Sequence, residues 1–340
     1  MQIKTLFTLF LCFLTSFCLH AAASPALTSR PEVKNFIQHM VQAHHFDAKQ
    51  LQQLLNQATL QPSIIAAISK PAEAKPWDAY EKIFITPKRI QEGIEFWQHN
   101  QKALSGAQKK YGVPAEMIIA IIGVETFYGK NTGQYNVIDA LVTLAFDYPP
   151  RAKFFLSELE QFLLLAREEG WDPKSIKGSY AGAMGNPQFI ASSYRHYAVD
   201  FNNNGKRDLL NGIDDSIGSV ANYFRLNGWQ PGAPVVLPAK VSGEKYKDHI
   251  ASKQNPKPSH SLYQMSLLGV QLKSPKTTPE LEKQNFALVA LQGANGPEFW
   301  LGAQNFYVIT RYNRSDHYAM AVYTLSQKIK EGYKKAGQAT

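Results

Sequence analysis

The stretch from Met117 to Gly129 constrains the fold of this chain more than any other. Pro114 suits the first turn of a helix, because proline lacks the N–H that a helix start leaves unused. The residues that follow are apolar on most sides of the predicted helix: Met117, Ile118, Ile121, Ile122 and Val124. A helix that is apolar on all sides has no polar side that could be exposed to solvent. We therefore predict that it is buried inside a largely helical domain.

Glu125 stands at the C-terminal end of this apolar helix. A carboxylate beside so much aliphatic surface is costly to ionise, so we expect its pKa to be raised. A carboxyl group that keeps its proton near neutral pH suits a general acid. The alternative, which the stretch alone leaves open, is a Glu that turns into solvent or meets an Arg.

The beginning of the chain has the pattern of a secretory signal peptide, residues 1–23. Lys4 precedes an apolar run from Leu6 to Leu19, and an Ala-x-Ala site at Ala21–Ala23 follows it. The run is short for a membrane span. The rest of the 340 residues is enough for two or three domains. This pattern predicts export, and we expect a periplasmic protein.

Both cysteines, Cys12 and Cys18, lie inside the apolar run. The mature protein would then have neither a cysteine nor a disulfide. Cys18 is also a candidate for lipid anchoring at the outer membrane, but Phe17 before it is bulky where a small residue is expected. The lipid-anchored form is the alternative to a soluble one.

The net charge of the chain is +9, and its pI is about 9.3. An exported basic protein has little occasion to meet nucleic acid, so we expect an anionic envelope polymer as its partner. The lysines are scattered apart from small clusters at Lys240–Lys257 and Lys328–Lys335. The charge alone is equally compatible with a role in solubility.

Apolar spacing predicts helices along most of the chain. They are expected at 33–41, 51–55, 87–104, 115–125, 136–146, 149–169, 192–199, 215–227 and 317–331. Short apolar runs between Pro, Gly, Ser and Lys at 235–237, 263–272 and 286–291 are typical of strands instead. The predicted class is mainly α (α+β). The predicted parts are an N-terminal helical region 24–104, a core 105–232, a small antiparallel β insertion 233–300 and a C-terminal part 301–340 that returns to the core.

Several other chemistries have no motif in this sequence. It contains no Gly-rich phosphate loop, no HExxH and no GxSxG nucleophile elbow. His44 and His45 form a pair on a predicted surface helix, which we interpret as structural rather than metal-binding.

Four separated motifs surround Glu125 in the sequence. They are Gly123-Val-Glu-Thr-Phe-Tyr-Gly129, Gly182-Ala-Met-Gly-Asn-Pro-Gln-Phe189, Ser219-Val-Ala-Asn-Tyr-Phe224 and Tyr307-Val-Ile-Thr-Arg-Tyr-Asn-Arg-Ser-Asp-His-Tyr-Ala319. In this order they resemble the lytic murein transglycosylase B family, which has a lysozyme-like core. The resemblance extends from about Trp77 to Tyr323. It implies a monomeric, periplasmic enzyme that acts on peptidoglycan glycan strands.

The resemblance also implies roles for individual residues. Glu125 matches the single catalytic acid/base, Ser179 a serine that hydrogen-bonds it, and Gln188 a glutamine that faces the sugar. Asn313 matches an amide near the reacting sugar. The aromatic residues that match those of the substrate cleft are Tyr80, Tyr223, Tyr312 and Tyr318.

Two positions depart from the family pattern. Arg151 matches one of two adjacent arginines that face peptide carboxylates, but Pro150 occupies the place of the other. Asn186 stands where an aromatic or apolar residue is common. The first departure predicts a weaker grip on the peptide, and the second puts one sugar contact in question.

A site with one carboxylate fits a reaction in which the substrate supplies the nucleophile. Ordinary glycosidases pair an acid with a second carboxylate, and the motifs offer none beside Glu125. In murein, the C6 hydroxyl of MurNAc can attack its own C1, which cleaves the β-1,4 bond to GlcNAc and leaves a 1,6-anhydro end. The alternatives are a hydrolytic muramidase, with water as nucleophile, and a peptidoglycan-binding protein without activity.

The segment from Asp200 to Asp208 has the Asp-x-Asn-x-Asn-Gly spacing of an EF-hand loop, with Gly205 at the turn. The resemblance implies a longer calcium loop closed near Asp214 or Asp215. The candidate ligands are Asp200, Asn202, Asn204 and Asp215. Asn in place of Asp means less negative charge and weaker binding, so we expect calcium as a structural ion at most and no cofactor for the reaction. The alternative is a loop held by its own Asx turns.

Overall fold

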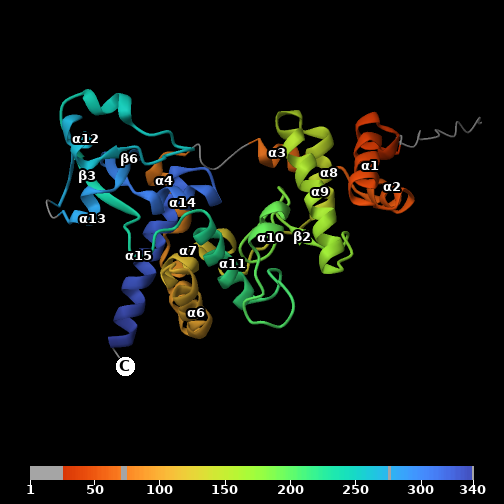
Figure 1. Cartoon of the computed structure of the whole chain (residues 1–340), viewed down its shortest axis with the longest axis horizontal. Helices are drawn as coiled ribbons and strands as arrows, with labels where there is room; N and C mark the ends of the chain where they lie inside the picture. The colour runs from red at the N-terminus through yellow and green to blue at the C-terminus, as the bar shows by residue number, and fades with distance from the viewer. Residues whose placement is uncertain (1–25, 70–74, 275–276, 339–340) are drawn as a thin grey trace, which may run out of the picture. The chain divides into compact units, whose positions relative to one another are not determined.

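The computed structural model describes residues 26–69, 75–274 and 277–338 (Figure 1). The predicted signal peptide, with Cys12 and Cys18, lies outside these residues. The described chain divides into two compact units at Gln57 and Ala58. The predicted division into parts at 104, 232 and 300 stays a prediction. In the described part, none of the helices combines the length and apolarity needed to cross a bilayer.

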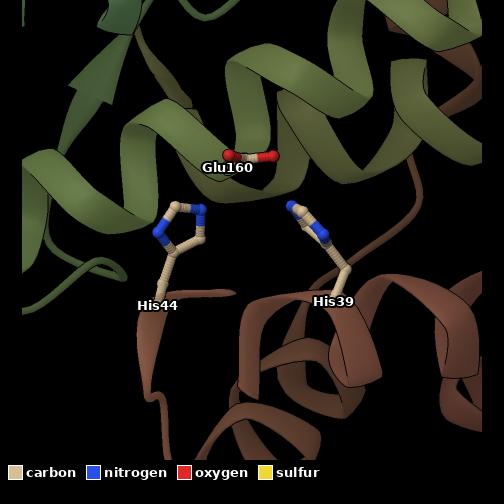
Figure 2. Close-up of side chains that lie close together, drawn as sticks. All are labelled: His39, His44 and Glu160. Carbon is tan, nitrogen blue, oxygen red and sulfur yellow. The ribbon is translucent and has the colours of Figure 1, made fainter. Parts of the chain in front are cut away.

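The first unit is a small helical body. A 3-10 turn at Leu27–Ser29 precedes α1 (Pro31–His44) and α2 (Ala48–Gln57). His45 ends α1 with a left-handed backbone, φ 58°. The rings of His39 and His44, both in α1, meet edge to face with centroids 5.6 Å apart (Figure 2). Glu160, also labelled in Figure 2, belongs to α9 of the second unit.

The second unit is mainly helical, as predicted. Its helices are α3 (Pro62–Ile68), α4 (Trp77–Phe84), α5 (Pro87–His99), α6 (Gln101–Tyr111), α7 (Ala115–Thr126), α8 (Val137–Asp147), α9 (Ala152–Glu169), α10 (Ala191–Tyr197), α11 (Ile213–Leu226), α12 (Leu262–Leu267), α13 (Pro279–Glu282), α14 (Gln304–Tyr312) and α15 (Asp316–Gln338). Short 3-10 turns lie at Pro149–Arg151 and Lys245–His249. The apolar helix α7 packs against α5, α6, α11 and α15, so its predicted burial is confirmed (Figure 1).

A five-stranded antiparallel sheet lies between α11 and α14 in the sequence. The strand order is β4-β6-β7-β3-β5, formed by β4 (His260–Ser261), β6 (Asn285–Gly293), β7 (Gly296–Gly302), β3 (Val236–Val241) and β5 (Val270–Leu272). The sheet and α12 share a small core that includes Met265, Phe286 and Leu301. A separate two-stranded ribbon pairs β1 (Tyr135–Asn136) with β2 (Lys177–Gly178).

Two sequence-based predictions of elements were wrong. The single helix 87–104 is broken at Asn100, whose side-chain amide donates to Phe96 O at 2.8 Å. Such local bonds of Asn compete with the helix ladder. The strand predicted at 263–272 begins instead as α12, because Ser261 and Gln264 form a reciprocal capping box at its start. Only its last residues form a strand, β5.

Candidate active site

Glu125 is the one residue of α7 that is not fully buried. All its neighbours in the helix are buried, so Glu125 is the residue of α7 whose side chain is partly exposed at the edge of the core. The helix ends at Thr126, because Phe127 and Tyr128 take left-handed backbone conformations with φ of 53° and 61°. Such conformations are costly for non-glycine residues and cluster at functional sites.

Tyr318 donates a hydrogen bond from its hydroxyl to Oε1 of Glu125, with 2.5 Å between the oxygens. It belongs to the first turns of α15 and is 2% exposed. Burial raises the pKa of Tyr318 well above its usual range, and the nearby Glu125 carboxylate raises it further. The phenol therefore stays neutral and remains a donor. Tyr318 of the fourth motif is thus in direct contact with Glu125.

Tyr312 and Tyr223 continue a row of aromatic rings from Tyr318. The Tyr312 ring stacks on Tyr318 with centroids 6.4 Å apart and an interplanar angle of 13°, and Tyr223 lies 4.8 Å from Tyr312. The Tyr312 hydroxyl donates to Pro187 O and the Tyr223 hydroxyl to Arg311 O, each at 2.5 Å. Burial raises the pKa of both phenols, so both remain donors. The first bond joins the end of α14 to the glycine-rich loop, residues 179–190 between β2 and α10, and the second joins α11 to α14.

The glycine-rich loop after β2 positions Ser179 and Gln188. The Ser179 hydroxyl oxygen accepts bonds from the N–H groups of Ala181 and Ala183, at 3.2 and 3.1 Å. Gln188 has a left-handed backbone, φ 51°, and its side-chain amide donates to Thr132 O and Gly185 O, both at 3.0 Å. A side-chain carbon at Gly185 would lie 2.2 Å from Leu209 O, so the loop passes close to the backbone at Leu209.

Ser179 and Gln188 line one cleft of about 610 Å³. The bond that the resemblance implies between Ser179 and Glu125 stays a prediction.

The other predicted substrate residues lie in different surroundings. Tyr80 of α4 is 2% exposed and packs against the rings of Trp77, Phe84 and His317. Asn313 follows the end of α14, is half-buried, and its carbonyl accepts from the Ser315 N–H. Their roles at the sugar stay predictions, and the deep burial of Tyr80 leaves little of its ring for a ligand.

Arg151 is exposed at the start of α9, where its guanidinium lies 4.3 Å from the centre of the Phe154 ring. Asn186 is 8% exposed, and its side chain donates to Ser216 Oγ at 3.2 Å. Asn186 is thus used inside the protein. The departure from the family pattern at Asn186, and its effect on one sugar contact, stays a prediction.

Thr126 is a residue of the site that the sequence analysis did not single out. It follows Glu125 directly, is completely buried, and bonds through its hydroxyl to Asn186 O at 2.8 Å. It also accepts from the Gly129 N–H at 3.0 Å. Thr126 therefore joins the end of α7 to the glycine-rich loop. Its place inside the first motif was the only signal that could have indicated this.

The predicted calcium loop is closed by Asp215, which is completely buried at the start of α11. Oδ1 of Asp215 accepts from the N–H of Phe201 at 2.8 Å, and Oδ2 accepts from the N–H of Asp208 at 2.9 Å. Asp200 accepts from the N–H groups of Asn204 and Gly205, at 3.0 and 2.7 Å. The loop is therefore ordered by Asx-type hydrogen bonds.

The side-chain oxygens of Asn202 and Asn204 accept N–H bonds within the same loop. With Asp200 and Asp215 they form a set of two carboxylates and two amides. Oxygen ligands of this kind suit calcium, although Oδ1 of Asp215 already accepts two N–H bonds, from Phe201 and Asn202. The set fits a weakly bound structural ion.

Comparisons with known proteins show which family this chain belongs to. Residues 28–327 match the transglycosylase SLT domain family. The chain is 42% identical over 311 residues to membrane-bound lytic murein transglycosylase B of Escherichia coli K12, covering 88% of this chain and 83% of that protein.

Solved structures of lytic transglycosylases are similar to this chain over most of its length. The crystal structure of soluble lytic transglycosylase SltB1 from Pseudomonas aeruginosa has a TM-score of 0.82 at 46% identity, covering 89% of this chain and 99% of that one. The Escherichia coli lytic transglycosylase Slt35 in complex with calcium has a TM-score of 0.80 at 42% identity, covering 89% and 94%. SltB3 from Pseudomonas aeruginosa in complex with NAG-NAM-pentapeptide has a TM-score of 0.76 at 29% identity, covering 89% and 80%. The resemblance read from the four motifs is confirmed, and the chain belongs to the transglycosylase SLT domain family of lytic murein transglycosylases.

Proposed function

We propose that this lytic murein transglycosylase cleaves the MurNAc–GlcNAc β-1,4 bond with Glu125 as its single acid and base. The observation that carries the proposal is the place of Glu125, at the end of a buried apolar helix with one oxygen held by Tyr318. A general acid needs a fixed position near the leaving oxygen and an environment that tunes its pKa.

The reaction then proceeds in two proton transfers. Glu125 in its acid form protonates the glycosidic oxygen as the bond from that oxygen to C1 of MurNAc breaks. The carbonyl oxygen of the 2-acetamido group holds C1 in the intermediate. The C6 hydroxyl attacks C1, and the Glu125 carboxylate accepts the hydroxyl proton. The product is a 1,6-anhydro sugar, no water is consumed, and Glu125 returns to its acid form.

The aromatic row Tyr223, Tyr312 and Tyr318 supports this proposal. Tyr223 and Tyr318 are 7% and 2% exposed, so these two rings act by holding the site together rather than by offering a face to the sugar. The three hydroxyls all donate inward, to Arg311 O, Pro187 O and Glu125. The rings are therefore fixed before substrate arrives, and the row serves to position Glu125 and the glycine-rich loop around the reacting sugar.

Product analysis tests the reaction. Purified sacculi are digested with the enzyme, and the released muropeptides are weighed by mass spectrometry. Anhydro products carry one water less than hydrolysed ones. We expect anhydro ends. Products with a reducing MurNAc end would identify a hydrolytic muramidase instead, and sacculus binding without release would identify a binding protein.

We propose calcium as a structural ion of the loop between Asp200 and Asp215. The two carboxylates and two amides could hold it, and bound calcium would add charge compensation and rigidity to the loop. The Slt35 structure from Escherichia coli is described as a complex with calcium. The reaction itself needs no group from this loop.

We also propose that the protein works as a monomer in the periplasm, with association at the outer membrane only if Cys18 is lipidated. The exported pattern of residues 1–23 and the location of murein support this. Mass spectrometry of the mature protein decides between the forms. We expect an N-terminus at Ser24, whereas a lipid-modified Cys18 would contradict it. Light scattering of the purified enzyme should give the monomer mass.

A further inference from the structure

The cleft beside Ser179 and Gln188 extends along the β1–β2 ribbon, and we call it the β1–β2 pocket. Its volume is about 610 Å³, and ten residues line it: Gln61, Asn131, Gly133, Gln134, Tyr135, Asn136, Lys177, Ser179, Tyr180 and Gln188. Two of these belong to the predicted substrate site. The other eight have no assigned role in the reaction described above.

Close backbone packing forms part of the lining of this pocket, at Gly133. Gly133 has φ of +100°, and a side-chain carbon there would lie 2.0 Å from Gly178 O. The loop before β1 can therefore approach β2 only because this position has no side chain. In the ribbon, Tyr135 pairs with Gly178 and Asn136 pairs with Lys177. Directly opposite residues of an antiparallel pair lie on one face of the ribbon.

Several side-chain amides of the pocket donate into the protein. The buried carboxylate of Asp139 accepts from the side-chain amides of Gln61 and Asn136, both at 3.3 Å. Gln188 donates both of its amide bonds to backbone carbonyls, at 3.0 Å each. Gln188, with both of its amide N–H groups bonded, has its carbonyl oxygen left for a ligand, whereas Gln61 and Asn136 each donate one such bond. The pocket therefore favours a ligand with N–H or O–H donors.

Lys177 is the one charged residue among the ten that line the pocket. It is exposed and stands opposite Asn136 on the ribbon. A ligand that satisfies the whole pocket has N–H donors for the amides and a negative group for the ammonium. A peptide that carries carboxylates has both.

We propose that the β1–β2 pocket binds the peptide stem of the murein strand, with Lys177 pairing with a stem carboxylate. This inference rests on the proposed function, since the stem is attached to the sugar that Ser179 and Gln188 are proposed to face. It gives the chain a cationic contact with the peptide apart from Arg151, whose guanidinium covers the Phe154 ring and whose neighbour is Pro150. Lys177 is thus a specificity residue rather than a catalytic one.

Binding to a protein that cannot turn over tests the inference. In the Glu125→Gln background, Lys177→Ala, Lys177→Glu and a control, Lys102→Ala on the exposed side of α6, are titrated by calorimetry. One ligand is a glycan fragment that carries tetrapeptide stems. The other is the same fragment stripped of peptides by an amidase.

We expect Lys177→Ala to weaken binding of the stem-bearing fragment about two- to fivefold, the range of a solvent-exposed ion pair. Lys177→Glu should weaken it further through repulsion, while the stripped fragment and the Lys102→Ala control stay unchanged. An equal loss for both fragments, or no loss, would overturn the inference. Failure of the proposed function would be visible separately, as absence of anhydro ends from the unmodified enzyme.

Discussion

The hydroxyl of Tyr318 and the carboxyl of Glu125 lie 2.5 Å apart, although 193 positions separate the two residues in the sequence. This bond joins the start of α15 to the end of α7. It holds one carboxyl oxygen of Glu125, so that the group keeps a single orientation. A donor to the carboxylate also favours its charged form, which opposes the effect of the apolar helix around it.

Replacing Tyr318 by Phe should therefore change both the rate and its pH dependence. Loss of a hydrogen bond to a charged group is worth about 1.5–3 kcal/mol, so kcat should fall about tenfold or more, with a smaller effect on KM. Without the phenol the acid form of Glu125 is favoured, so the alkaline limb of the pH profile should move up by about one unit. Tyr323→Phe, on the same helix, is the control. An unmoved limb would show that the phenol does not tune Glu125.

Glu158 of α9 gives a stability prediction with a defined sign. Burial raises the pKa of this carboxyl above its usual value of 4.5, while bonds from the Ser192 hydroxyl and N–H partly oppose the rise. Below pH 4.5 the group is protonated in both states and adds no penalty. As the pH rises through the folded pKa, the buried carboxylate lowers the stability.

Glu158→Gln should remove that penalty. Near neutral pH the free energy of unfolding should rise on the order of 1 kcal/mol and the melting temperature by a few degrees, with little effect on either below pH 4.5. Its muropeptide release should equal that of the unmodified enzyme, because Glu158 serves α10 through Ser192. Melting curves at the two pH values measure the effect. Equal gains at both would mean that packing, not ionisation, is responsible.

Calcium should add modest stability and leave the chemistry unchanged. The loop is already ordered by hydrogen bonds to Asp200 and Asp215, so the ion has little left to organise. A site of millimolar affinity adds roughly 1 kcal/mol or less at a few millimolar calcium. Thermal melts and activity assays in EGTA and in calcium provide the measurement. A gain of many degrees, or activity abolished by EGTA, would contradict this account.

The sequence predicted the elements whose signal is local and periodic. The apolar run around Ile121 predicted the buried helix α7, and the four motifs in their order predicted the family to which the chain belongs. It failed where tertiary packing or side-chain bonds decide. Asn100 breaks a helix through its own amide. The burial of Tyr80 against Trp77 of its own helix and His317 of α15 also depends on packing between distant segments, which no spacing could indicate.

The same limit applies to the candidate site. The EF-hand spacing indicated Asp200. The hydrogen bonds that Asp215 accepts from backbone N–H groups form only in the folded loop, so the spacing did not indicate them. The β1–β2 pocket requires strands of two residues each, too short for any periodic pattern. Lys177 therefore had no signal in the sequence, whereas Glu125 had a strong one.

The most direct test of the account is the change of Glu125 to Gln, which keeps the shape of the side chain and removes its acid proton. General acid–base catalysis contributes about 10²–10⁴-fold, and here one group performs both transfers. Muropeptide release from sacculi should fall at least about a hundredfold, with sacculus binding and melting temperature almost unchanged. Glu160→Gln, on α9, serves as the control and should release muropeptides normally. If Glu125→Gln kept more than about a tenth of the release, another carboxyl group would be the acid and the account would be wrong.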